Sequence, residues 1–325
     1  PGAGAAGGIG GALGGREQLC EGKYLHYQPA ETDVSIRDGW FWRDNTHQQT
    51  RTADNVFDIY ERSVGGNAIL LLNLPPDNQG RFPEKDLEVL EETGRRIRET
   101  YGIDLLEGAK CPKALLDNDI DTYIKVNDGE DFVVTLPEKR WINRIVGERA
   151  ERFAVDARID GEWKEIATST NIGHKRILRV NDMETDAFRF RLLQSRAMVA
   201  ISKMSAHYSH WGPFYGNPFD TPELQEYDKN AWRTEGNSNV LVFGGQRRLG
   251  GIVYNPAAGK SESGIVSGVV SISYDGLSWT EVSSFEFGNL VNDPSPRYVH
   301  FHNPVGCRYL RIVSESLDPT LIGLF

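Results

Sequence analysis

Two pairs of similar segments occur in the same order in this sequence, and they constrain the fold more than any other feature. Residues 159–166 read IDGEWKEI and residues 274–282 read YDGLSWTEV, which matches with one residue inserted. Further along the chain, residues 188–193 (FRFRLL) are similar to residues 308–313 (RYLRIV). Segments repeated in order indicate a duplicated domain type. The 325 residues are enough for two or three domains.

Both repeats lie in strand-rich parts of the chain. In residues 103–208 we predict short strands at 132–136, 142–146, 153–159, 164–167, 187–193 and 201–207. Turn residues separate these strands at short spacing, which is typical of an antiparallel β-sandwich. Residues 223–325 have the same pattern, so we expect a second β-sandwich there. Residues 209–222 are rich in Pro, Gly and aromatic residues and are predicted to be a linker.

The chain up to residue 102 mixes helices with an apolar strand. Residues 53–64 have apolar positions at helical spacing, and residues 68–74 form a continuous apolar run, as in a strand buried on both faces. Pro83 opens a second helix. Its predicted inner stripe is Leu87, Leu90, Gly94 and Ile97. Helix, buried strand, helix is the order found in a β/α barrel or a doubly wound sheet.

Composition excludes several classes of protein. The net charge of −10 and the pI of about 5.3 disfavour binding to nucleic acid. No apolar run approaches the roughly 20 residues that span a bilayer. The three cysteines, Cys20, Cys111 and Cys307, indicate neither a disulfide framework nor a zinc site. Residues 1–15 are almost all Gly and Ala without an initiator Met, so we expect a linker or loop that begins inside a longer protein.

A charged segment next to aromatic residues is the candidate site. Residues 29–41 read PAETDVSIRDGWF and place Glu31, Asp33 and Arg37 just before Trp40. Polar groups at a strand end beside an aromatic wall suit sugar binding, because hydroxyls need directional hydrogen bonds and the apolar sugar face needs a ring. The other interpretation is an Asp–Arg pair that ties the strand to its neighbours. The residues alone favour that second interpretation.

Several blocks of the first region together resemble glycoside hydrolase family 29, the α-L-fucosidases. The resemblance covers residues 28–100 and rests on PAETDVSIRDGWF at 29–41, DIY at 58–60, SVGGN at 63–67, LLLNLPPD at 70–77 and Gly80. It is closer to the branch that prefers α-1,3/1,4-linked fucose. The resemblance implies a (β/α)8-like barrel of which this chain holds the C-terminal part. It also implies a retaining mechanism, with an Asp nucleophile and a Glu acid/base roughly 5–5.5 Å apart.

The resemblance implies a role for four residues. Trp40 matches the aromatic that packs against the C5 methyl of fucose. Glu31, Asp33 and Arg37 match the motif beside the pocket, with Glu31 near the substrate but not as acid/base. Trp42 and Arg43 depart from the Tyr-His expected there, so contacts beyond fucose are expected to differ.

The remaining positions that match the family receive no catalytic role. Asn73 and Asp77 are interpreted as strand-end and turn residues. We assign no catalytic residue to this chain, because the nucleophile and acid/base blocks of the family lie upstream of the segments seen here. The chain alone is therefore expected to be inactive.

The two strand-rich regions resemble discoidin or coagulation factor 5/8 type C domains and the related carbohydrate-binding module family 32. The first carries LDNDIDTY at 116–123, and the second carries LGGIVYNP at 249–256. Asp117, Asp119 and Asp121 alternate like cation ligands, so they are weak candidates for a structural calcium site and no other cofactor is expected. Trp163 and Trp279 of the repeat are predicted to be core residues. Composition leaves open whether three further aromatics contact sugar or pack in the linker: Trp211, Phe214 and Tyr215.

These observations together predict the C-terminal part of a secreted, retaining α-L-fucosidase that acts on fucosylated oligosaccharides or glycoconjugates. The alternative is a carbohydrate-binding or structural protein with an inert barrel remnant. A third interpretation is that the sandwiches only brace the barrel and bind no sugar.

Overall fold

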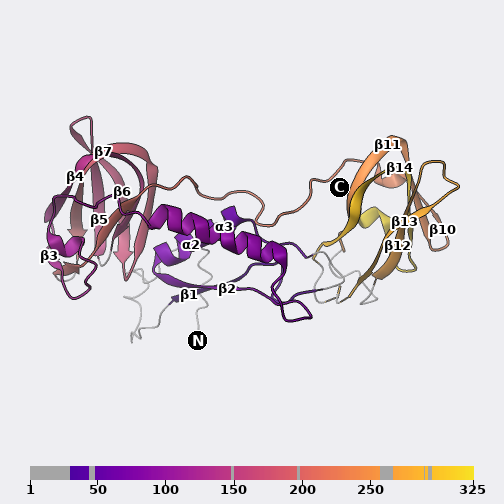
Figure 1. The fold of residues 1–325 in the computed structure, drawn as a ribbon, viewed down its shortest axis with the longest axis horizontal. Helices are drawn as coiled ribbons and strands as arrows, with labels where there is room; N and C mark the ends of the chain where they lie inside the picture. Colours follow the sequence, from indigo (N-terminus) through magenta and orange to yellow (C-terminus); the bar gives the residue numbers. More distant parts are fainter. Residues whose placement is uncertain are drawn as a thin grey trace. The chain divides into compact units, whose positions relative to one another are not determined.

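The computed structural model describes residues 30–43, 48–147, 150–195, 198–256, 266–288, 290–291 and 295–325. Contacts divide the chain into two compact units (Figure 1). The described part of the first unit comprises residues 30–36, 51–73 and 84–218, without 148–149 and 196–197. The second unit comprises the described residues of 37–50, 74–83 and 219–325.

The first unit begins with two parallel strands and two helices. Strands β1 (Ala30–Ser35) and β2 (Ala68–Asn73) pair in parallel, and helix α2 (Ala53–Ser63) with the short 3-10 turn η1 (Val64–Gly66) connects them. Helix α3 (Glu84–Tyr101) follows, and both helices lie on one side of the strands (Figure 1). The predicted helices and strand are confirmed in type and place.

Helix α2 illustrates why the sequence forms these elements. Thr52 caps its first turn, because the Thr52 Oγ1 accepts a hydrogen bond from the Asn55 N–H at 3.2 Å. Val56, Phe57 and Ile59 are buried at helical spacing.

The prediction that β2 is buried on both faces is wrong. Ile69 and Leu71 are 55% and 49% exposed. Helix α2 contacts β2, and both helices lie on one side of the two strands, so they leave the opposite side uncovered (Figure 1). The register pairs Glu31 with Ile69 and Asp33 with Leu71, so these four side chains share one face. We call this the open face of β1 and β2.

The inner stripe predicted for α3 is also wrong by one position. Its buried residues are Asp86, Val89, Thr93 and Thr100, whereas Leu87 and Leu90 are exposed. Polar residues occupy the buried stripe because they have partners there. The Thr93 hydroxyl donates to the Val89 carbonyl at 2.8 Å.

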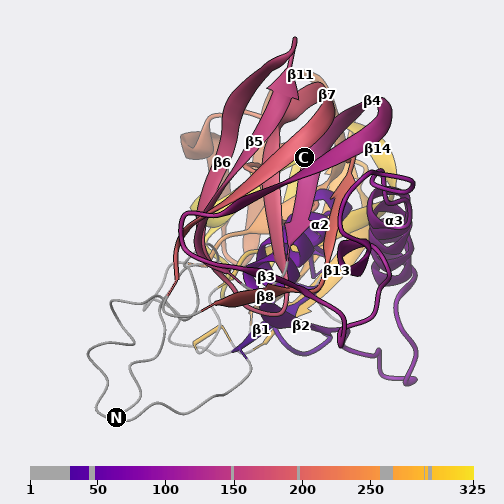
Figure 2. The same cartoon turned by 90° about the vertical axis from the view of Figure 1, so that its left-hand side faces the viewer.

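The rest of the first unit is antiparallel β structure with its own apolar core. The sheet order is β6-β5-β7-β4-β9, and β3 pairs with β8. The elements are η2 (Lys113–Leu115), β3 (Ile124–Val126), β4 (Asp131–Gly147), β5 (Ala150–Ile159), β6 (Glu162–Ile172), β7 (Arg176–Gln194), β8 (Val199–Ile201) and β9 (Met204–His207). The long strands lie side by side (Figure 2). The two strands predicted at 132–136 and 142–146 are one strand, β4, with an irregular register after Thr135.

The second unit contains another antiparallel sheet over a separate apolar core. Its strand order is β10-β11-β14-β12-β13, and β15 pairs with β11. The elements are η3 (Lys229–Ala231), β10 (Trp232–Glu235), β11 (Ser238–Tyr254), β12 (Val266–Ser273), β13 (Thr280–Phe287), β14 (Arg297–Val313), η4 (Pro319–Leu321) and β15 (Ile322–Leu324).

The two copies of the first repeat, residues 159–166 and 274–282, adopt the same local structure. Each forms a turn between antiparallel strands, β5–β6 and β12–β13, with the repeated glycine in a left-handed conformation (φ 82° at Gly161 and 77° at Gly276). The prediction that Trp163 and Trp279 are core residues is wrong, because both are half-buried. Arginine covers each ring instead: Arg189 lies 5.0 Å from the Trp163 centroid, and Arg311 lies 4.2 Å from that of Trp279.

The remaining predictions concern the N-terminal residues, the cysteines and membrane-spanning helices. Residues 1–15 and Cys20 lie outside the described part of the chain. Within the described part of the chain, Cys111 and Cys307 form no disulfide. Among the described helices, none is long and apolar enough to cross a bilayer.

Candidate functional site

The open face of β1 and β2 presents two carboxylates beside apolar side chains. Glu31 and Asp33 are exposed, and within the described part of the chain neither has a hydrogen-bond or ion-pair partner. Their neighbours on this face are Ile69 and Leu71. At the ends of the two strands, the Asn73 Nδ2 donates to the Ser35 Oγ at 3.2 Å. The two strands are thus tied at their C-terminal ends, and both carboxylates are exposed among the described residues.

The segment after β1, residues 37–43 and 48–50, belongs to the second unit and carries Trp40. Gln48 holds it together, since the Gln48 Nε2 donates to the carbonyls of Asp38 at 2.5 Å and Phe41 at 2.9 Å. Gly39 has a φ of 97°, which suits glycine and little else. Trp40 is 49% exposed, so its ring lies at the surface of a constrained loop and not in a packed core.

Arg37 has a different place from the other predicted site residues. It is buried, pairs with Thr50 in an isolated antiparallel bridge and does not continue β1. Its Nη1 donates to the Gln48 carbonyl at 3.4 Å. Glu31 and Asp33 lie in the first unit, whereas Arg37 and Trp40 lie in the second.

The loop that carries Trp40 packs against the C-terminal strands of its own unit. The Arg43 Nη1 donates to the Ser295 Oγ at 3.4 Å. Burial and the nearby charge of Asp38 raise the pKa of Tyr298 on β14. The conformation of this loop therefore depends on residues about 250 positions later in the chain.

Asn73 and Asp77 have the structural roles predicted for them. Asn73 bridges the strand ends, as described above. The Asp77 Oδ1 accepts the backbone N–H of Gln79 at 2.8 Å and that of Arg81 at 2.9 Å. These two hydrogen bonds lower the pKa of Asp77, and the bond from the Arg81 N–H has the larger effect.

The calcium candidates do not converge. The Asp117 carboxylate accepts the Asp119 N–H at 3.0 Å and the Thr122 hydroxyl, and the Asp119 Oδ1 accepts the Asp121 N–H at 3.0 Å. Such bonds cap turns, so the alternation of aspartates reflects turn chemistry. Over the described ranges, no group of three or more His, Cys, Asp or Glu residues is arranged to hold a metal. The calcium prediction is therefore not supported.

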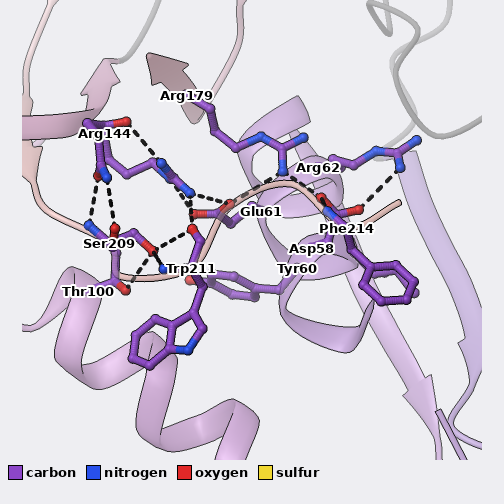
Figure 3. A network of polar contacts seen from close by, with 12 residues as sticks. Asp58, Tyr60, Glu61, Arg62, Thr100, Arg144, Arg179, Ser209, Trp211 and Phe214 are labelled. Carbon is purple, nitrogen blue, oxygen red and sulfur yellow. Dashed lines mark hydrogen bonds and ion pairs between the residues drawn. The ribbon is translucent and has the colours of Figure 1, made fainter. Parts of the chain in front are cut away.

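A buried network of charges joins α2 to the β structure of the first unit (Figure 3). Glu61 lies at its centre and accepts hydrogen bonds from the Arg144 Nε at 2.6 Å, the Arg144 Nη2 at 3.1 Å and the Tyr101 hydroxyl at 2.6 Å. The Arg144 and Glu61 side chains are only 3% and 0% exposed. Burial and the charge of Glu61 raise the pKa of Tyr101, so its hydroxyl remains a donor.

A second carboxylate on α2 extends the network. Asp58 accepts from the Arg179 Nη1 of β7 at 2.5 Å, from the Arg62 Nη1 at 3.2 Å and from the Phe214 backbone N–H at 3.3 Å (Figure 3). Asp58 and Glu61 are three positions apart and face the same neighbours. Two acidic residues on one helix thus bind two arginines of the sheet.

The segment after β9 completes the connection. The Trp211 carbonyl accepts from the Arg144 Nη2 at 2.8 Å, and its ring packs edge-on against Phe57 with centroids 5.7 Å apart. Asn143 and Ser209 exchange two hydrogen bonds of 2.7 and 2.8 Å. Trp211 and Phe214 therefore support the packing interpretation of this segment, while Tyr215 is exposed.

Sequence reasoning missed this network. The available signal was the position of Asp58 and Glu61 between apolar residues of an amphipathic helix. Charged groups there are buried only if they are paired, which predicts arginine partners but does not say which ones.

Comparisons with known proteins agree with two of the sequence resemblances. Residues 12–100 match the family described as alpha-L-fucosidase, and residues 215–320 match the F5/8 type C domain. The chain is 29% identical over 217 residues to Alpha-L-fucosidase 1 of Arabidopsis thaliana, covering 58% of this chain and 42% of that protein.

Solved structures point the same way. A Bacteroides ovatus structure named for α-L-fucosidase is 27% identical with a TM-score of 0.53, covering 91% of this chain and 52% of that one. A Ruminococcus gnavus GH29 fucosidase in complex with fucose is 26% identical with a TM-score of 0.52, covering 57% of this chain and 42% of that one. The chain thus spans about half, or less, of the length of each of these proteins, and it resembles the glycoside hydrolase family 29 fucosidases.

Proposed function

We propose that this chain is the C-terminal part of a retaining α-L-fucosidase that releases α-linked L-fucose, with a preference for α-1,3/1,4 linkages. One observation supports the proposal: the segment that matches the fucosidase family carries two exposed carboxylates on β1, Glu31 and Asp33, which have no partner among the described residues, and its following loop exposes the Trp40 ring. The substrates would be fucosylated oligosaccharides or glycoconjugates, met outside the cell by a secreted protein.

The proposed roles follow from the chemistry of fucose. Its C5 methyl offers nothing to hydrogen-bond, so an exposed indole such as Trp40 suits it as an apolar wall. Glu31 and Asp33 would accept hydrogen bonds from sugar hydroxyls or from groups that bind them. Arg37 would hold the Trp40 loop in shape, because it is buried against the Gln48 carbonyl.

The bond-making carboxyls are proposed to lie in segments other than these 325 residues. In the retaining mechanism, an Asp oxygen attacks the anomeric carbon while a Glu gives its proton to the departing oxygen. The same Glu then takes a proton from the water that releases fucose. Neither group is assigned to a residue of this chain.

We propose the following domain division. Residues 1–102 would form the C-terminal part of the barrel, and residues 209–222 a linker. Residues 103–208 and 223–325 would be discoidin-like sandwiches. Both β regions make contacts that favour a bracing role: Arg144 and Arg179 hold α2, and Ser295 contacts the loop that carries Trp40.

The test compares Trp40→Ala with Trp141→Ala in the gene product that contains this chain. Trp141, 57% exposed on β4, is a matched control outside the proposed site. Trp40→Ala should lower kcat/KM for an α-1,3-fucosylated trisaccharide by about 10- to 100-fold, since each 1.4 kcal/mol of lost transition-state binding costs about tenfold. Wild-type kinetics for Trp40→Ala, or an equal loss for Trp141→Ala, would overturn the proposed role.

The missing carboxyls have a separate test. The purified 325-residue chain should release no 4-nitrophenol from 4-nitrophenyl α-L-fucoside. Release abolished by Glu31→Gln or Asp33→Asn would instead place a catalytic carboxyl within this chain.

A further inference from the structure

A shallow pocket in the second unit contains no residue of the Trp40 loop and has no role in the proposed function. It has a volume of about 480 Å³ and is lined by Gln246, Arg247, Arg248, Tyr274, Pro304 and Gly306. Three parts of the chain form it: an irregular stretch of β11, the turn after β12 and the middle of β14. The register pairs Arg248 with Gly306, so the two lie side by side.

The pocket concentrates positive charge in an acidic protein. Within the described part of the chain, neither Arg247 nor Arg248 has a carboxylate partner. The Arg247 Nη1 donates to the Glu226 carbonyl at 2.8 Å, and its guanidinium lies 5.5 Å from the Phe243 ring centroid. Arg247 is thus held in place without losing its charge, and Arg248 is exposed beside it. A pair of arginines like this is suited to bind a carboxylate or sulfate.

Tyr274 supplies an exposed ring in a defined position. It is 56% exposed. A Cβ atom at Gly306 would lie 2.7 Å from the Tyr274 Oη and 2.9 Å from the Gln246 Nε2, so the tyrosine and the amide both rest on the glycine backbone. An aromatic ring, an amide and two cations around one hollow match what an acidic sugar needs: a surface for its apolar face, a hydroxyl partner and a counter-charge.

The carboxylate that adjoins Tyr274 in the sequence makes its hydrogen bonds within its own turn. Asp275, next to Tyr274, accepts the backbone N–H groups of Ser278 and Leu277, each at 2.8 Å, and the Ser273 hydroxyl at 3.0 Å. These hydrogen bonds lower the pKa of Asp275 to about 2, and the bond from the Ser278 N–H has the largest effect. The carboxylate is therefore used within its own turn and makes no ion pair with the arginines.

We propose that this pocket binds an anionic sugar, one whose ring carries a carboxylate or a sulfate group. Tyr274 would contact the sugar ring, Gln246 a hydroxyl, and Arg247 and Arg248 the anionic substituent. This inference is independent of fucose hydrolysis, because no pocket residue lies in residues 12–100.

The test measures binding of three probes to the 325-residue chain by isothermal titration calorimetry: a heparin tetrasaccharide (sulfated), tetragalacturonate (carboxylated) and maltotetraose (neutral). At least one anionic probe should bind saturably, and maltotetraose should bind at least about tenfold more weakly. Arg248→Gln and Tyr274→Ala should each weaken the anionic probe by about tenfold. The control is Arg233→Gln, which removes an exposed arginine on β10 of the same unit and should change affinity less than about twofold.

The outcomes show which anionic group binds and whether the proposal holds. Preference for the heparin probe identifies sulfate as the group bound, and preference for tetragalacturonate identifies carboxylate. Absence of saturable binding of both anionic probes, equal binding of maltotetraose, or an equal loss in Arg233→Gln would each overturn the proposal. Trp40→Ala should leave this binding unchanged, so failure here and failure of the fucosidase proposal are distinguishable.

Discussion

Replacing Glu61 by alanine is expected to destabilise the first unit strongly. The substitution leaves Arg144 buried and charged, with its Nε and Nη2 no longer bonded to a carboxylate, and it removes the acceptor of the Tyr101 hydroxyl. Breaking a buried ion pair by removing one partner costs about 3–5 kcal/mol, because the remaining charge stays desolvated. With a urea m value of about 2 kcal/mol/M, the unfolding midpoint should fall by about 1.5–2.5 M.

The assay is urea unfolding followed by far-UV circular dichroism, with hydrogen exchange of residues 53–63 to locate the loss on α2. The matched control is Glu99→Ala. Its pair with Arg95 has an N–O distance of 2.6 Å, but its side chains are 46% and 48% exposed, so the loss should stay below about 1 kcal/mol. Salt should shrink the small effect at Glu99 and leave the effect at Glu61 unchanged.

A double variant tests the cause. Adding Arg144→Met to Glu61→Ala removes the stranded charge, so the double variant should be more stable than Glu61→Ala alone. A loss below about 1 kcal/mol for Glu61→Ala, or a double variant less stable than the single one, would refute the argument from burial.

Two further variants address pH and packing. Burial lowers the pKa of His207 below 6.5, outweighing the hydrogen bond to the Ile103 carbonyl and the charge of Asp104, so the unfolded chain takes up the proton more readily. The contribution of His207 to the free energy of unfolding should therefore be complete above pH 6.5 and decrease as the pH falls below that value. His207→Gln should reduce the slope of the free energy of unfolding against pH between pH 7.5 and 5.5. An unchanged slope would mean that other groups cause the pH dependence. Gly251→Ala should destabilise the second unit by about 1–3 kcal/mol in urea unfolding, because its Cβ would overlap the Val299 carbonyl and the Phe325 ring. Gly244→Ala on the same strand meets no atom within 4 Å and should stay within about 0.5 kcal/mol; equal losses would contradict the packing argument.

The elements of this chain were largely predictable, since local pattern sets them. The helix at 53–64, the apolar strand at 68–74 and the strands of residues 103–208 were predicted from periodicity and turn residues, and residues 223–325 were predicted to be rich in strands. Their faces were less predictable. Leu87 and Leu90 suggested an inner stripe that α3 does not use, because the residues that a helix buries depend on what packs against it.

For the candidate site too, the residues were predictable from the sequence but their placement was not. The motif that holds Glu31, Asp33, Arg37 and Trp40 was visible in one line of sequence, but these residues fall in two compact units and Arg37 is buried against its own loop. The aspartates at 117, 119 and 121 had ligand-like spacing, but the carboxylates of Asp117 and Asp119 cap turns. Spacing alone does not tell a ligand from a cap, because both use a carboxylate that faces nearby donors.

The sequence by itself determined the types of element, the repeated segments at 159–166 and 274–282, and the resemblance of residues 28–100 to the fucosidases, because each depends on neighbours along the chain. Only the tertiary structure decided that Glu61 meets Arg144 across 83 positions, that Arg43 meets Ser295 across 252, and that Arg247, Arg248 and Tyr274 surround one pocket. Such pairings arise from how sheets and loops pack in space, and the free energy that selects them comes from burial and charge compensation between residues that no local pattern links.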